Sequence, residues 1–136
     1  MPCPYFEPDH TVPGASHSNA RLPLLVEHDG FCHATPDTAR VPDELRFRCC
    51  NHGYSRGSCE RLPAAEVRSC TRYNVVRRSD AVLEVLCIEE QNYSPVRWHS
   101  IQYSIAGDAL MADAGDVCLG AQLLAFCRSY LKRFPG

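Results

Sequence analysis

Cysteine is the residue type in this sequence best suited to chemistry. Nine cysteines occur in 136 residues, and four lie near glycine or proline in segments without a regular pattern: Cys3, Cys32, Cys50 and Cys59. Thiolates bind zinc and iron–sulfur clusters, and side chains in loops converge without the restraint of a helix or strand. We therefore predict that these four residues bind a metal or cofactor and that none of them is catalytic.

The spacing of the four cysteines indicates which metal they would bind. Their separations are 29, 18 and 9 residues, and the chain contains no CxxC pair, which zinc ribbons and fingers typically have. Widely spaced thiolates also suit a [4Fe–4S] cluster, whose negative charge nearby arginines would offset. An iron–sulfur cluster is therefore favoured, and zinc is the alternative. The arginines near the predicted site are Arg46, Arg48, Arg56 and Arg61.

Other residues near these cysteines leave alternatives open. Cys49 could be the ligand in place of Cys50, but it follows Leu45 by one helical turn, which favours core packing. His33 and His52 follow predicted ligands and could replace a cysteine, although a surface or hydrogen-bonding role is favoured for both. We expect the remaining thiols to serve the core, or to be exposed, rather than to bind metal: Cys70, Cys87, Cys118 and Cys127.

The same cysteines carry a resemblance to a known pattern. The strings CPYF, GFC and CNHGYSRGSCERLP resemble an uncharacterised bacterial family with a CPYF start, a GxC and a CNxGYxRGxCxxFP block. The resemblance covers most of the chain and implies Cys3, Cys32, Cys50 and Cys59 as the matching positions, without implying an activity. More loosely, the CC pair is similar to the CxxxCCxxxxFxxxC motif of proposed zinc- or iron-chelating proteins, from which this chain departs because it lacks the first cysteine at the required spacing.

The two halves of the chain differ in composition. Eight of the ten prolines fall in residues 1–63, which favours loops and excludes long helices. One short helix is predicted from Pro42 to about Gly53. A loop-rich segment buries little apolar surface, so we expect bound metal to stabilise this cysteine module.

Residues 64–136 have a more regular pattern. Strands are predicted over 67–76, 82–90 and 97–105, with His99 facing the core and Trp98 the outer face. An amphipathic helix capped by Asp113 or Asp116 ends the chain. The predicted fold is a single α+β domain over residues 1–136, with a small antiparallel three-stranded sheet, a C-terminal helix and a loop-rich, cysteine-ligated N-terminal module.

Composition limits the function classes. The net charge of −2 gives no bulk basic surface for nucleic acid, and no apolar stretch is long enough to insert in a membrane. The cysteine-rich chain has an odd cysteine count and no apparent signal peptide, which favours a reducing, cytoplasmic location. We expect a small iron–sulfur protein in electron transfer, or a redox-active accessory subunit, with a redox partner or larger complex. The alternative is a zinc-stabilised interaction module, and an enzyme is disfavoured.

Overall fold

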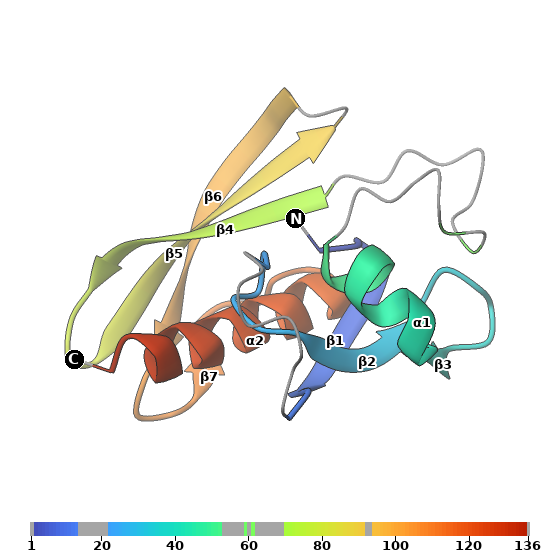
Figure 1. Ribbon diagram of the computed structural model, residues 1–136. Helices are drawn as coiled ribbons and strands as arrows, with labels where there is room; N and C mark the ends of the chain where they lie inside the picture. Colours follow the sequence, from blue (N-terminus) through green and yellow to red (C-terminus); the bar gives the residue numbers. More distant parts are fainter. Residues whose placement is uncertain are drawn as a thin grey trace.

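An antiparallel meander forms the larger of two sheets in the computed structural model (Figure 1). The structure describes residues 2–13, 22–52, 59, 61, 70–91 and 94–135. Neighbouring strands in this sheet follow sequence order: β4 (Cys70–Arg78), β5 (Val82–Gln91), β6 (Ser94–Ser104) and β7 (Ala109–Leu110). Along β5, the residues Leu83, Val85 and Cys87 are buried while their neighbours are half-buried. This alternation directs one face of the sheet towards the core.

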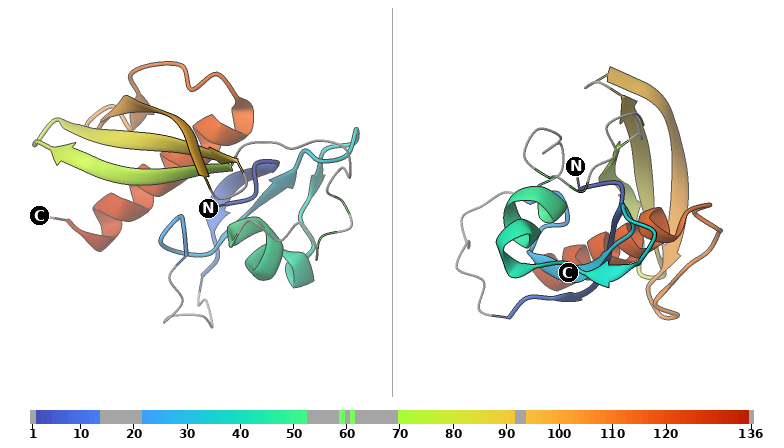
Figure 2. Two further views of the ribbon diagram at one scale, coloured as in Figure 1. Left: turned by 90° about the horizontal axis from the view of Figure 1, so that it is seen from above. Right: turned by 90° about the vertical axis from the view of Figure 1, so that its right-hand side faces the viewer.

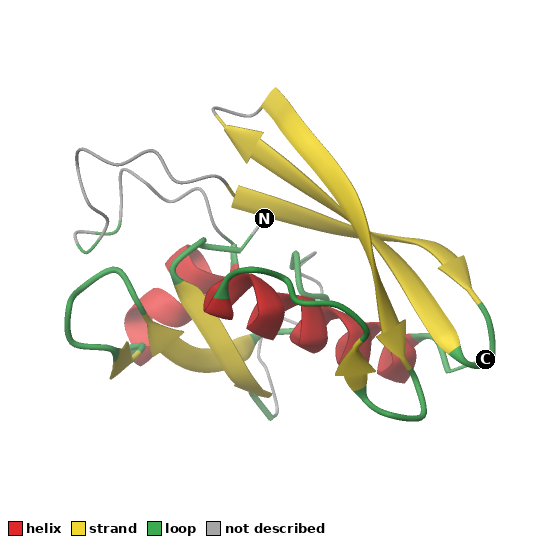
Figure 3. Cartoon of the chain, turned by 180° about the vertical axis from the view of Figure 1, so that it is seen from behind, coloured by secondary structure: helices red, strands yellow, loops and turns green. Residues whose placement is uncertain are grey.

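Helix α2 (Val117–Arg133) covers the inner face of this sheet. Its first turn is capped by Asp116, whose carboxylate accepts a hydrogen bond from the Leu119 amide at 3.1 Å. Buried residues of the helix, among them Leu123 and Phe126, pack against Tyr73 and other residues of the inner face. Seen from behind in Figure 3, α2 passes along the larger sheet and continues to the smaller one.

The smaller sheet contains three antiparallel strands: β1 (Phe6–Thr11), β2 (His28–Cys32) and β3 (Ala39–Arg40). Figure 2 shows this sheet beside the larger one, with α2 reaching both. The β1–β2 pair depends on Gly30, since a Cβ atom at that position would lie 2.1 Å from the carbonyl oxygen of Glu7. A bulge between Pro8 and His10 interrupts the pairing register.

A short helical segment follows the smaller sheet. It consists of α1 (Asp43–Leu45), which begins directly after Pro42, and the π-helical turn η1 (Arg46–Asn51). The acidic residues Asp43 and Glu44 lie in its first turn, where their negative charges interact favourably with the positive end of the helix dipole. A π-helical turn is uncommon and often occurs where a helix serves a functional site.

The predicted α+β class, the antiparallel strands and the C-terminal helix are confirmed, and the differences concern the N-terminal half and the ends of the larger sheet. Residues predicted as loops form β1, β2 and β3, and a fourth strand, β7, adds to the predicted three. The beginning of the predicted 67–76 strand lies outside the described residues. His99 is exposed instead of buried, because residues 94–100 of β6 are all exposed and core-facing burial begins only at Ile101.

Candidate cysteine site

Three of the predicted ligands lie at one end of the smaller sheet. The Cys3 amide donates a hydrogen bond to the Cys50 carbonyl at 3.0 Å, and the Phe6 amide donates to the Cys3 carbonyl at 3.0 Å. Phe6 is in turn the register partner of Cys32 across β1 and β2. A turn, a strand and a π-helical turn therefore bring together cysteines that are 29 and 18 residues apart in sequence.

The side chains of these three cysteines share one apolar cluster. Cys32 and Cys50 are buried in it together with Phe6 and Val41, and Cys3 packs against them. The expectation that all four predicted ligands lie in loops is therefore wrong for two of them, because Cys32 ends β2 and Cys50 lies in η1. Regular backbone fixes the positions of both residues.

Cys59, the fourth predicted ligand, lies close enough for its charge to affect Cys3 and Cys50. A negative charge on its thiol would raise the pKa of Cys3 and of Cys50, and a charge on Cys32 would do the same. Cys70, at the start of β4, also faces Cys3 closely enough to raise the pKa of Cys3. Cys32 and Cys59 thus lie within electrostatic range of both Cys3 and Cys50, and Cys70 affects Cys3 more strongly than Cys59 does.

Burial dominates the acid–base properties of these thiols. Removal from solvent raises the pKa of Cys3 to about 12, against a backbone hydrogen bond from Tyr5 that lowers it. Burial likewise raises the pKa of Cys50 far above its ordinary value. Both thiols therefore hold their protons at neutral pH unless a cation replaces them, and ligation of a metal would have to release those protons.

Asn51 fixes η1 against β2. Its side chain is buried, with Oδ1 accepting from the His28 amide at 2.8 Å and Nδ2 donating to the carbonyls of His28 and Arg46 at 2.9 and 2.8 Å. These bonds satisfy the amide at both ends and determine where its neighbour Cys50 lies. Sequence reasoning did not identify this role, because an asparagine next to a cysteine has no distinctive pattern.

Gln122 connects the turn from Cys3 to Phe6, the Cys3 turn, to helix α2 by hydrogen bonds. This buried residue of α2 donates from Nε2 to the carbonyls of Cys3 and Phe6, both at 2.8 Å. Its Oε1 accepts a hydrogen bond from the Tyr73 hydroxyl at 2.9 Å. One side chain therefore connects the cysteine site, the helix and the larger sheet, and sequence reasoning did not identify it.

Arg46, one of the arginines predicted to offset the charge of the site, and the histidines His33 and His52 contact other residues. The Arg46 guanidinium is 2.7 Å from the buried Glu27 carboxylate and 2.9 Å from Asp43. His33 contacts Glu7 at 2.7 Å, and His52 packs edge-on against Phe47. Arg56, also predicted near the site, lies outside the described residues.

The other five cysteines follow the prediction of a packing role. All are buried: Cys49, Cys70, Cys87, Cys118 and Cys127. Cys87 and Cys127 belong to the main core between the larger sheet and α2. Burial raises the pKa of Cys87 to about 11 and that of Cys127 to about 12, as expected of neutral core thiols.

The donor set at the cysteine site is chemically suited to a thiophilic metal or an iron–sulfur cluster, since thiolates are the ligands that both prefer. As the side chains stand, no group of three or more histidine, cysteine or acidic residues within the described ranges is arranged to hold a metal ion.

None of the described helices has the length and apolar character needed to cross a membrane. Comparisons of the chain with protein-family models, with curated proteins and with solved structures give no match.

Proposed function

We propose that the chain is a small iron–sulfur protein whose cluster is ligated by Cys3, Cys32, Cys50 and Cys59. The observation that supports this proposal is the convergence of thiols from separate segments, three of them in one apolar cluster and the fourth within electrostatic range. A bound cluster would supply reversible one-electron transfer, in the protein itself or as an accessory subunit of a redox partner.

The surrounding residues would serve such a site in three ways. Phe6 and Val41 limit the access of water to the sulfurs. In the turn from Cys3 to Phe6, the Tyr5 backbone N–H bonds to the Cys3 sulfur and lowers the pKa of Cys3. Asn51 and Gln122 hold the backbone on either side of the site. The thiols are thus supported by buried hydrogen bonds, as a metal site requires.

Zinc is the alternative metal, and one purification can distinguish the two. The full chain is purified without oxygen, reconstituted with iron and sulfide, and analysed for iron, sulfide and zinc. A brown protein with about four irons and four sulfides per chain supports a [4Fe–4S] cluster. A colourless protein with stoichiometric zinc supports the interaction module instead, and a chain that retains neither metal contradicts both proposals.

Matched cysteine substitutions then identify the ligands. Cys32→Ser removes a predicted ligand, and Cys87→Ser removes an equally strand-bound, buried thiol from the main core. We expect the iron content to fall in the first variant and to stay at the wild-type value in the second. Equal iron content in both variants would show that Cys32 is not a ligand.

A further inference from the structure

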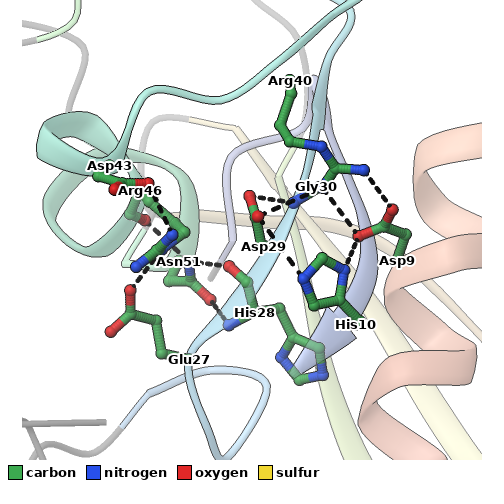
Figure 4. Close-up of polar contacts among 10 residues, drawn as sticks. All are labelled: Asp9, His10, Glu27, His28, Asp29, Gly30, Arg40, Asp43, Arg46 and Asn51. Carbon is green, nitrogen blue, oxygen red and sulfur yellow. Dashed lines mark hydrogen bonds and ion pairs between the residues drawn. The ribbon is translucent and has the colours of Figure 1, made fainter. Parts of the chain in front are cut away.

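A cavity of about 410 Å³ lies between the smaller sheet and α2, on a side of the helix that the cysteine site does not use. Ala121, Leu124 and Ala125 of the helix form one wall, and Pro8 and His28 belong to the opposite wall. The volume and the mainly apolar lining are typical of small-molecule sites. Figure 4 shows His28 and His10 with their rings next to each other, and α2 beyond them.

Two buried polar atoms of the cavity wall, Nε2 of His28 and the Ser129 hydroxyl oxygen, have no hydrogen-bond partner in the described part of the chain. The His28 side chain uses Nδ1 at 3.0 Å from the Val26 carbonyl, so Nδ1 carries the proton and Nε2 is left as an acceptor. His28 is 3% exposed and Ser129, whose hydroxyl makes no hydrogen bond with a described residue, is 7% exposed. Buried polar groups are normally hydrogen-bonded, so this pair indicates a partner that the chain itself does not supply.

Among the charged residues that line the cavity, Asp9 and Arg128 form ion pairs, and Lys132 forms none with a described residue. The Asp9 carboxylate contacts Arg40 at 2.9 Å and His10 at 2.6 Å, and Arg128 contacts Asp108 at 2.9 Å. Lys132 lines the cavity, is exposed, and forms no ion pair with any described residue. Arg40 also contacts Asp29 at 3.3 Å, so this one cation serves two carboxylates at the His10 end of the cavity. Lys132 lies at the other end and favours an anionic group beside it.

We propose that this cavity binds a small carboxylic acid that has an apolar body and a hydroxyl group. The apolar body packs against Ala121 and Leu124, the hydroxyl donates to Nε2 of His28, and the carboxylate lies at Lys132. Each part of the ligand thus matches one feature of the wall: the apolar helix face, the free acceptor and the free cation. This binding is separate from the iron–sulfur proposal and does not depend on it.

The test titrates the full chain with 3-(4-hydroxyphenyl)propionate as the probe and monitors binding by two-dimensional NMR. We expect saturable shifts at residues that line the cavity, with a Kd below about 1 mM. Two related probes test the two ends of the ligand: 3-phenylpropionate lacks the hydroxyl, and tyramine replaces the carboxylate with an amine. Both should bind at least about threefold more weakly, because each loses one polar contact.

Protein variants test the same geometry from the other side. Ala121→Leu fills the cavity from a half-buried helix position and should weaken binding more than about tenfold, whereas Ala112→Leu adds equal volume outside the cavity. Lys132→Gln should weaken binding of the carboxylate probe about three- to tenfold. The matched variant of the neighbouring residue, Arg133→Gln, should leave the affinity unchanged. Absence of saturable binding, or equal affinity in Ala121→Leu, Lys132→Gln and wild type, would overturn the proposal.

Discussion

Replacing Gln122 with leucine should destabilise the protein more than any other conservative change on α2. The side chain is 2% exposed and makes three hydrogen bonds, to the carbonyls of Cys3 and Phe6 and from the Tyr73 hydroxyl. Leucine is of similar size but removes all three bonds; the Cys3 carbonyl keeps the Phe6 amide as a donor, whereas the Phe6 carbonyl and the Tyr73 hydroxyl lose the partner described above. A buried group that loses its partner costs about 1–3 kcal/mol, so for these two groups we expect the free energy of unfolding to fall by about 2–6 kcal/mol.

Two matched variants isolate the origin of this loss. Tyr73→Phe removes only the bond to Gln122 and should cost about 1–2 kcal/mol. Gln122→Glu keeps an acceptor for Tyr73 but places an oxygen against two carbonyls, so it should be as destabilising as leucine. Urea unfolding of the single and double variants gives the coupling between Tyr73 and Gln122, which we expect to be about 1 kcal/mol.

Hydrogen exchange adds a local measurement. In Gln122→Leu, protection should fall first at the amides of Cys3 and Phe6, which belong to the turn that Gln122 holds, while amides within β5 should stay protected. A loss in unfolding free energy below about 1 kcal/mol, or one equal to that of Tyr73→Phe, would refute the role assigned to this side chain.

Three further predictions test other parts of the structure. Arg46→Met should cost about 2–4 kcal/mol in urea unfolding because the buried Glu27 carboxylate loses its cation. Arg40→Met removes an exposed cation from Asp9 and Asp29 and should cost less than Arg46→Met. Burial lowers the pKa of His28 from 6.5, so the unfolded chain binds the proton more readily; the free energy of unfolding should be smaller at about pH 5.5 than at about pH 7.5. Iron loading should strengthen with rising pH because ligation must remove a proton from Cys3, whose pKa is about 12, and Cys3→Ser should weaken this pH dependence in a chelator competition assay.

The larger sheet and α2 could be predicted because their residues follow simple periods. Leu83, Val85 and Cys87 alternate with less buried neighbours, and Asp116 caps an apolar helical stripe. His99 follows the same alternation but is exposed, since a period of two identifies a face without showing where its covering helix ends. Periodicity thus predicted the elements of this half better than their burial.

The smaller sheet had no such signal. Its strand β2 contains His28, Asp29 and Gly30, which are poor strand formers, and β1 contains Pro8 at a bulge. These residues are strand residues for tertiary reasons: Gly30 allows the close approach to Glu7, and the His28 backbone bonds to the Asn51 side chain. A single sequence does not reveal such contacts between distant residues.

For the candidate site, the residue types could be predicted and the supporting contacts could not. Cys3, Cys32 and Cys50 share one cluster, but Cys70, which the prediction left out, also interacts with Cys3, and the expectation of loops at Cys32 and Cys50 is wrong. The roles of Asn51 and Gln122 depend on partners 23 and more than 100 residues away. Side-chain to backbone bonds of this kind have no sequence pattern.

The contact between β1 and α2 serves both proposed sites, and neighbouring helix residues make it possible to separate them. Gln122 holds the Cys3 turn, whereas Ala121 lines the cavity; successive residues of a helix point about 100° apart. If the sites act independently, Ala121→Leu should weaken binding of the carboxylate probe more than about tenfold and leave iron content unchanged. Gln122→Leu should lower iron content by releasing the Cys3 turn, while the probe still binds to the variant under conditions in which it remains folded. Loss of both properties in both folded variants would instead mean that β1 and α2 respond as one unit, and the two sites would then have to be treated as coupled.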